Sequence, residues 1–376
     1  MSVLVREIEG PRDRKEFIAL PVRLHRDHAL WVPPLINDEK RFLDSSRNPA
    51  FAYSDVTVAL AWEGKQVVGR VMGIINNRHN ALVGEHTARF SQLECENDHT
   101  VCHALLGHVE SWARGKGMNR VVGPMGFTDQ DPQGFLIEGF EHEPTISTYF
   151  NHEYLPGLVE REGYRKEVDY VVYRVPVTRE IPSVYNAALR RLSRRKDYEL
   201  LEFRSRRELR RWSRPILELM SETFTGLYGF VPLTPREIDD LTRRFLPILD
   251  PRFVKVVNHK GLAVGFVVGM PNIDEGLRKA AGRLYPFGII HVLRASRRAK
   301  QLDLLIGGIR KDHRGLGLVA LLGAAMFRSA RDRGFAFMDS HHELEDNTAV
   351  RSEMERVGGH IYKRYRIYGK TLFTLQ

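Results

Sequence analysis

A glycine-rich turn between an apolar run and a helical pattern is the sharpest chemical signal in the sequence. The run Leu302–Ile309 is followed by the turn 310–317, which reads Arg-Lys-Asp-His-Arg-Gly-Leu-Gly, and apolar residues then recur at helical spacing over 318–326. Glycines let a backbone approach a ligand closely, and the first amides of a helix have no partner within it. The turn therefore predicts a phosphate or pyrophosphate site, to which Arg310 and Arg314 add positive charge.

Two common nucleotide-binding motifs do not fit this turn. It lacks the Gly-x-x-x-x-Gly-Lys-Ser/Thr of a P-loop, and Ala320 stands where Gly-x-Gly-x-x-Gly has its last glycine. A nucleotide hydrolase or a Rossmann dehydrogenase is therefore poorly supported. By itself, a Gly-x-Gly is more often only a tight turn between a strand and a helix. Here the strand before it and the helix after it favour an anion site.

Groups that could transfer protons follow the next predicted strand, Phe335–Asp339. His341 and Glu345 are the preferred candidates for a catalytic base, since imidazole and carboxylate groups both accept protons in enzyme sites. The alternative is that these side chains only form local hydrogen bonds at the end of a strand.

The turn and the segment after it resemble the GNAT superfamily of acyl-CoA N-acyltransferases. The GNAT pattern is Arg/Gln-x-x-Gly-x-Gly/Ala; Arg314 and Gly317 fit its first two fixed positions, while Val319 replaces the third. A second GNAT feature is an Asn before a helix, a glycine turn and a tyrosine-rich last strand, as in Asn347, Gly358-Gly359 and the strand beyond. The resemblance implies acyl-CoA or acetyl-CoA as co-substrate and no metal. It implies CoA contacts from Ile309, Arg310, Arg314, Gly315, Leu316, Gly317, Leu318, Val319 and Asn347.

In GNAT enzymes a free amine attacks the thioester, so the resemblance implies a base and a donor for the thioester oxygen. The backbone over 307–309 is the candidate donor. Many GNAT enzymes carry a tyrosine in the helix after the Asn, as acid for the leaving thiolate. That position is Met354 here, which cannot donate a proton. The resemblance then leaves Tyr362, or a water molecule, for this role.

The chain of 376 residues is long enough for two domains, and its halves repeat one order of predicted elements. Asn151 precedes a helix, a Gly-Tyr turn and a strand, as Asn347 does in the second half, which indicates an internal duplication. We therefore expect an α/β protein with two tandem GNAT-like domains, residues 1–180 and 181–376. Each should have a mixed, mostly antiparallel central sheet flanked by helices.

The first half has no glycine turn in the corresponding place. Residues 94–99 read Glu-Cys-Glu-Asn-Asp-His, and three carboxylates would repel a pyrophosphate, so this copy is not expected to bind CoA. The stretch 123–140 instead mixes glycines, aromatic residues and acids. Asp129, Asp131 and Glu138 could bind a cationic amine there, although an ordered surface loop explains the stretch equally well.

Positive charge is concentrated in the second half: residues 1–186 carry a net charge of −5 and residues 187–376 carry +15. Such an excess attracts polyanions, including CoA, nucleic acid and anionic lipid. No stacking-aromatic pattern or nucleic-acid module is evident, so no specific nucleic acid is predicted. Segment 274–300 is both basic and apolar, which suits contact with an anionic membrane or a cover over a long acyl chain. A helical hairpin packed on its own domain is the alternative.

The two cysteines lie in no metal-ligand spacing, and the first residues do not form a signal peptide. We therefore expect a cytoplasmic protein, with segment 274–300 able to place it at the inner face of the membrane.

The predicted function of the chain is acyl-CoA-dependent N-acylation, with a long acyl chain placed on an amino lipid such as a sphingoid base. In its layout the chain is similar to the bacterial ceramide synthase group. The alternatives are an acetyltransferase for a small-molecule or protein amine, and a non-catalytic protein that binds acyl-CoA or nucleic acid. The sequence makes no prediction of the oligomeric state.

Overall fold

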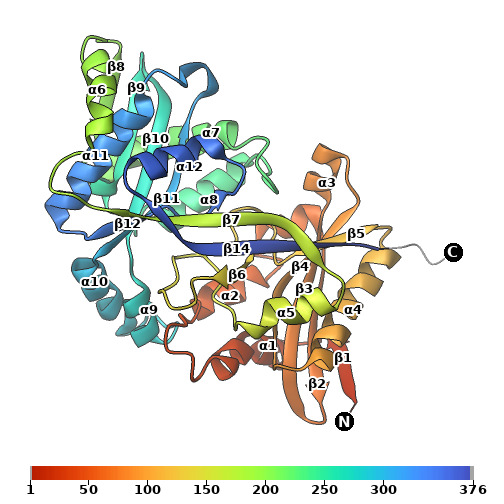
Figure 1. The fold of residues 1–376 in the computed structure, drawn as a ribbon. Helices are drawn as coiled ribbons and strands as arrows, with labels where there is room; N and C mark the ends of the chain where they lie inside the picture. The colour runs from red at the N-terminus through yellow and green to blue at the C-terminus, as the bar shows by residue number, and fades with distance from the viewer. Residues whose placement is uncertain (1, 373–376) are drawn as a thin grey trace. The chain divides into compact units, whose positions relative to one another are not determined.

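The computed structural model describes residues 2–372, and the chain divides into two compact units. Unit 1 comprises Met1–Val171, Asp274–Arg294 and Lys363–Gln376, and unit 2 comprises Val172–Ile273 and Ala295–Tyr362. Figure 1 labels the elements along the chain. Two strands, β7 (Arg165–Pro176) and β14 (His360–Thr371), have residues in both units. Each unit is therefore built from separate stretches of the sequence.

Unit 1 contains a mixed sheet in the order β1-β2-β3-β4-β5-β14. Its strands are β1 (Val3–Glu7), β2 (Ser54–Glu63), β3 (Gln66–Asn76), β4 (Thr87–Cys95) and β5 (Arg120–Gly123), and β6 (Phe135–Glu138) pairs with β14. Neighbours are antiparallel except β4 and β5, which are parallel. The helices are α1 (Pro11–Leu24), α2 (Ile36–Phe42), α3 (Asn77–Val83), α4 (His99–Gly115), α5 (Tyr154–Arg161) and α9 (Asp274–Ala280), and η1 (Pro49–Tyr53) is a 3₁₀ turn.

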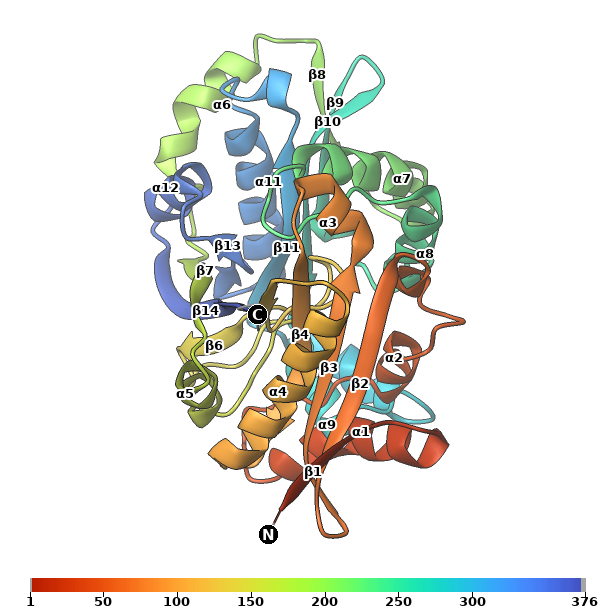
Figure 2. The same ribbon diagram turned by 90° about the vertical axis from the view of Figure 1, so that its right-hand side faces the viewer.

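Helix α4 lies along the strands of unit 1 and covers the main core of this unit (Figure 2). Its apolar face, including Val101 and Leu105, packs on β3. Glycines in that strand allow the close approach: a Cβ at Gly69 would lie 2.6 Å from Leu105 Cδ1, and one at Gly73 would lie 3.1 Å from the Trp112 ring. The helix therefore packs where the strand has no side chain of its own.

Unit 2 contains a second mixed sheet in the order β7-β12-β11-β10-β9-β8. Its strands are β8 (Tyr198–Glu202), β9 (Val254–His259), β10 (Leu262–Pro271), β11 (Gln301–Ile309) and β12 (Phe337–Asp339), and β13 (Glu343–Leu344) pairs with β7. Neighbours are antiparallel except β11 and β12, which are parallel. The helices are α6 (Asn186–Leu192), α7 (Arg206–Thr223), α8 (Pro235–Phe245), α11 (Leu318–Arg333) and α12 (Thr348–Arg356), while α10 (Gly288–Arg298) has residues in both units. Three 3₁₀ turns are η2 (Ser183–Tyr185), η3 (Pro251–Phe253) and η4 (Lys311–His313).

Helices cover both faces of the unit 2 sheet, as the alternation of its side chains requires (Figure 1). In β9, Val257 packs with Leu318 and Leu322 of α11, while its neighbour Val256 belongs to the cluster that includes Met220 of α7. This two-sided packing fixes α11 at the end of β11, where the glycine turn lies.

The compact units group the chain differently from the predicted ranges 1–180 and 181–376. Residues 274–294 and 363–372 belong to unit 1, and the last residues of β7 belong to unit 2. The predicted ranges describe a repeat along the sequence, and that duplication stays a prediction. Between residues 2 and 372, no helix combines the length and apolar character needed to cross a bilayer.

Candidate functional site

Strands β11 and β12 run side by side for only three residues. Gln301, Leu302 and Asp303 pair with Phe337, Met338 and Asp339, and β12 then ends. Over 304–309, β11 pairs with β10 alone among the described residues. The register with β10 also shifts between Val268 and Gly269, which makes Leu305 an extra residue on β11. Such a bulge increases the local twist of a strand. One edge of β11 is thus left without a neighbouring strand.

The open edge presents backbone amides. The amide of Arg310 donates to Val264 O on β10 at 2.9 Å. Because successive amides of a strand alternate in direction, those of Ile309 and Gly307 face away from β10. Gly307 is also exposed. This edge can therefore donate hydrogen bonds to a ligand, which is the role predicted for 307–309.

The glycine turn leads from the end of β11 into α11 and is mostly exposed. Gly315 has φ +75° and Gly317 has φ +88°, conformations that favour glycine. Gly317 is the N-cap of α11 and provides no side-chain hydrogen bond. Within residues 2–372, no acceptor binds the amides of 315–320, whereas the amide of Leu321 reaches Gly317 O at 3.2 Å. The turn and the first residues of α11 thus contain amides without an acceptor among the described residues, a feature of anion sites at helix N-termini.

Two arginines of the turn are held by the protein itself. Arg314 Nε donates to Ile309 O at 3.1 Å, so this side chain folds back on the end of the strand. Arg310 forms an ion pair with Glu222 at 2.7 Å. The backbone amides, more than these guanidinium groups, are the free donors of the turn.

Acidic groups and a tyrosine gather where β11 and β12 part. Asp339 is fully buried; its carboxylate accepts a hydrogen bond from the Tyr362 hydroxyl and one from the His341 amide at 2.7 Å. Burial and the adjacent Asp339 carboxylate raise the pKa of Tyr362. Asp303, also fully buried, accepts from Gln301 Nε2 at 2.7 Å and from Asn272 Nδ2 at 3.2 Å. The region where β11 and β12 stop pairing is therefore polar, and Tyr362 stays protonated there.

No protein-family model matches the chain, but full-length relatives and solved structures resemble it. It is 28% identical over 375 residues to a bacterial ceramide synthase of Caulobacter vibrioides. This match covers 97% of this chain and 96% of that protein. It is 26% identical over 381 residues to protein YghO of Escherichia coli, covering 98% and 95%. A tandem GNAT protein of the clavulanic acid pathway superposes over the full length of both chains with a TM-score of 0.58 at 14% identity. The chain has a tandem GNAT fold. A GNAT protein of Sphaerobacter thermophilus superposes over 98% and 95% with a TM-score of 0.51 at 14% identity.

The GNAT fold and the mixed-sheet architecture predicted from the sequence are confirmed. The residues predicted to contact CoA lie together along the end of β11 and the start of α11, apart from Asn347. That side chain is the N-cap of α12, with its oxygen 3.5 Å from the Val350 amide. Its predicted contact with CoA stays a prediction.

Of the residues predicted to transfer protons, the structure joins His341 and Tyr362 through Asp339. His341 has φ +60°, an uncommon conformation for a residue other than glycine, and it lies two residues after the end of β12. Glu345 follows β13, where its carbonyl oxygen accepts from Arg351 Nη1 at 2.7 Å. The catalytic roles of these side chains stay predictions.

Glu343 is a candidate that sequence reasoning missed. It lies on β13, between His341 and Glu345, and burial raises the pKa of its carboxyl to about 8. A carboxyl group that titrates near neutral pH is suited to general base catalysis. The sequence signal was an acid within a row of predicted site residues; its burial depends on the packing of the folded chain.

The three predicted substrate residues lie in unit 1. Asp131 accepts from the Thr128 amide at 3.1 Å and closes a loop. Asp129 belongs to the same loop, and burial raises its pKa to about 7. Glu138 lies at the end of β6, with 63% of its side chain exposed, 3.5 Å from Arg364. The structure thus groups Asp129 with Asp131 and places Glu138 on another element.

Proposed function

We propose that this chain is an acyl-CoA-dependent N-acyltransferase with its acyl-CoA site in unit 2. The supporting observation is the combination of an uncapped helix N-terminus at α11 with the open edge of β11 directly before it. The amides of 315–320 would hold the diphosphate of CoA. The acyl-CoA supplies an activated thioester, which a primary amine can attack.

The chain's own groups suit the remaining steps of this reaction. The amides of Gly307 and Ile309 would stabilise the negative charge that develops on the thioester oxygen. Glu343 or His341 would accept a proton from the ammonium form of the acceptor amine. The leaving thiolate would take its proton from a water molecule or from Tyr362, but burial and the adjacent Asp339 carboxylate raise the pKa of Tyr362 and so favour the water molecule. These roles extend the GNAT fold to specific residues.

A lipid substrate is supported by one relative and by one surface. The relative that matches over 97% of this chain is named a bacterial ceramide synthase, and a ceramide is a sphingoid base acylated on its amine. The surface lies between α9 and the last turns of α10: Tyr285 is 80% exposed, Phe287 70% and Leu293 52%. We propose a long-chain acyl donor and a sphingoid-type amine as acceptor.

The same surface supports contact with an anionic membrane. Exposed aromatic and aliphatic side chains lie beside exposed Arg283 and Arg294, the composition of helices that bind at lipid interfaces. The preceding segment is anchored within unit 1, where Arg278 pairs with Glu143 at 2.6 Å and donates to Ala29 O at 3.1 Å. Leu277 and Ala280 of this segment are buried, as the alternative of a packed hairpin also requires, so the exposed side chains alone support the membrane contact.

Thermal shift and thiol release test the enzymatic proposal. We expect CoA, acetyl-CoA and palmitoyl-CoA to raise the melting temperature, palmitoyl-CoA the most. Free CoA thiol should appear when palmitoyl-CoA and sphinganine are both present, and more slowly when ethanolamine replaces sphinganine. No thermal shift with any of the three ligands would end the proposal. Thermal shifts without thiol release would instead favour a protein that binds acyl-CoA without turnover, an alternative consistent with Met354.

Vesicle sedimentation tests the membrane contact separately. We expect binding to phosphatidylglycerol vesicles that falls with salt, and a several-fold loss in Phe287→Ser. Leu262→Ser is the matched control, since Leu262 is 58% exposed on another element. Equal binding of both variants would contradict a contact through this face.

A further inference from the structure

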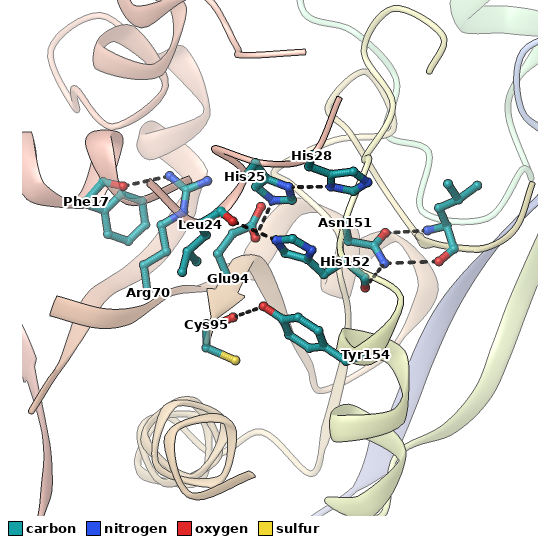
Figure 3. Close-up of polar contacts among 11 residues, drawn as sticks. Phe17, Leu24, His25, His28, Arg70, Glu94, Cys95, Asn151, His152 and Tyr154 are labelled. Atoms are coloured by element: carbon teal, nitrogen blue, oxygen red, sulfur yellow. Dashed lines mark hydrogen bonds and ion pairs between the residues drawn. The ribbon is translucent and has the colours of Figure 1, made fainter. Parts of the chain in front are cut away.

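Three histidines of unit 1 converge at a place that the proposed reaction does not use (Figure 3). His25 and His28 follow α1, and His152 lies just before α5. The Nδ1 atoms of His25 and His28 are 3.0 Å apart. One ring nitrogen from each of the three side chains lies within 4.8 Å of the other two. Segments far apart in the sequence thus bring three nitrogen donors together.

Hydrogen bonds on the far side of two rings set their tautomers. His25 Nε2 lies 3.2 Å from Glu94 Oε2, and His152 Nε2 lies 3.0 Å from Leu24 O (Figure 3). A carboxylate and a carbonyl oxygen only accept, so each Nε2 carries the hydrogen. The neutral rings then have a lone pair on Nδ1. Metal-binding histidines usually make this kind of bond through their other nitrogen, to a carboxylate or a backbone carbonyl.

Two of the three histidine rings have a path to solvent. His25 is 2% exposed, whereas His28 and His152 are half-buried. The positions of His28 and His152 give an ion access from outside.

We propose that His25, His28 and His152 form a zinc site, with Glu94 as the group that orients His25. Histidine ligands lie at about 2.0–2.1 Å from Zn²⁺, so two of them on a tetrahedral ion are roughly 3.3 Å apart. The Nδ1 atoms of His25 and His28 are close to that spacing, but they share a hydrogen bond in the structure. Because Nδ1 of His25 has the lone pair, Nδ1 of His28 donates, so His28 must carry its hydrogen on Nε2 instead to bind the ion. His152 stacks on His25 with ring centroids 4.3 Å apart, and its half-exposed ring must tilt to complete the site. Three protein ligands leave a fourth position for water.

A bound ion would join the segment after α1 to the segment before α5. The segment after α1 and helix α5 itself also meet β4: Glu94 of this strand bonds to His25, and Cys95 O accepts from the hydroxyl of Tyr154, the first residue of α5, at 2.8 Å. The expected role is therefore to stabilise unit 1. It is independent of the acyl-CoA site proposed in unit 2.

Zinc binding is tested on the full chain after EDTA treatment and desalting. After reloading with Zn²⁺ and a second desalting, we expect the chain to retain one equivalent of zinc by elemental analysis, and we expect added Zn²⁺ to raise the melting temperature of the zinc-free chain by several degrees. Both effects should be lost in His28→Gln and in His152→Gln. Glutamine keeps a polar side chain at each position, and circular dichroism of the zinc-free variants checks their folding.

A surface histidine pair supplies the control for adventitious binding. His99 and His103 stand one helical turn apart on α4, both bonded to Glu162, with 46% and 69% of their side chains exposed. His103→Gln should retain zinc as the wild type does. Loss of zinc in His103→Gln but not in His28→Gln would overturn the proposal, as would no retained zinc in the wild type. Co²⁺ gives a second measurement on the wild type: absence of the intense visible bands of a four-coordinate ion would also overturn it.

Discussion

Helices α4 in unit 1 and α11 in unit 2 begin in the same structural context, yet their first turns differ. Each follows a strand that pairs in parallel with the next strand for only three residues: 87–89 with 120–122, and 301–303 with 337–339. The start of α4 is capped by the Asp98 carboxylate, which accepts from the Thr100 amide at 2.7 Å. The N-cap position of α11 is a glycine, so no side chain caps this helix. One helix has a carboxylate that accepts from an amide of its first turn, and the other has first-turn amides without a side-chain acceptor.

The strand edges differ in the same way. In unit 1 the Gln92 amide donates to the Tyr149 hydroxyl at 3.1 Å, and the Tyr154 hydroxyl donates to Cys95 O at 2.8 Å. All residues of β4 are buried. In unit 2, the outer residues 304–309 of β11 are half-buried or exposed. The edge of β11 is therefore more open than the edge of β4, where side chains of the same unit bond to the strand.

The largest effect that we expect is a loss of activity when the carboxyl group of Glu343 in unit 2 is removed, but not when that of Asp129 in unit 1 is removed. Glu343→Gln in unit 2 should lower kcat by about 100-fold, the size expected for loss of a general base. The pKa of about 8 means that Glu343 is protonated below that pH and cannot accept a proton. Wild-type kcat/KM should therefore rise with pH through about 8, and Glu343→Gln should lose this rise.

Asp129→Asn in unit 1 is the matched control for Glu343→Gln, since burial raises the pKa of both carboxyl groups. Steady-state kinetics over the pH range compares the two. If Asp129→Asn abolished the rise of kcat/KM with pH and Glu343→Gln kept it, the catalytic base would belong to unit 1, and our assignment of the base to unit 2 would be wrong.

The second effect concerns the two helix N-termini directly. Val319 and Thr100 both occupy the second position of their helices, and both are exposed. A glutamate at Val319 would stand beside the proposed diphosphate site, and like charges there should weaken CoA binding by roughly 10- to 100-fold, or about 1–3 kcal/mol. Thr100→Glu should leave the affinity unchanged. Calorimetric titration with CoA measures both, and Val319→Gln controls for the change of shape.

Most of the open site could be predicted from the sequence because it is local. The glycine turn, Arg314 and the helix after it are consecutive, and their pattern alone predicts an anion site. The filled edge of β4 could not be predicted, because Tyr149 and Gln92 meet only in the folded chain. Glu343 gains its raised pKa from burial, which also depends on packing. The histidine cluster joins residues from distant segments, and no spacing in the sequence indicated it.

The third effect tests whether Tyr149 closes the edge of β4. Tyr149→Phe removes the hydroxyl that accepts from the buried Gln92 amide and lies 3.3 Å from Ser91 Oγ. An unsatisfied buried amide costs about 1–3 kcal/mol, so the free energy of unfolding should fall by that amount. Urea denaturation measures the loss. CoA affinity should stay at the wild-type value. A second equivalent of bound CoA in this variant would instead show that Tyr149 alone prevents unit 1 from binding CoA.

The smallest effect distinguishes a structural cap from a ligand site. Asp98→Ala removes the side chain that caps α4 and should lower the free energy of unfolding by about 1 kcal/mol, the usual value for an N-cap. Since the Thr100 amide then becomes free, unit 1 would gain one feature of the open α11 turn, but not its glycine conformation or its open strand edge. CoA affinity should therefore not change. A new CoA site in Asp98→Ala would mean that one carboxylate, and not the filled strand edge, keeps the first copy from binding.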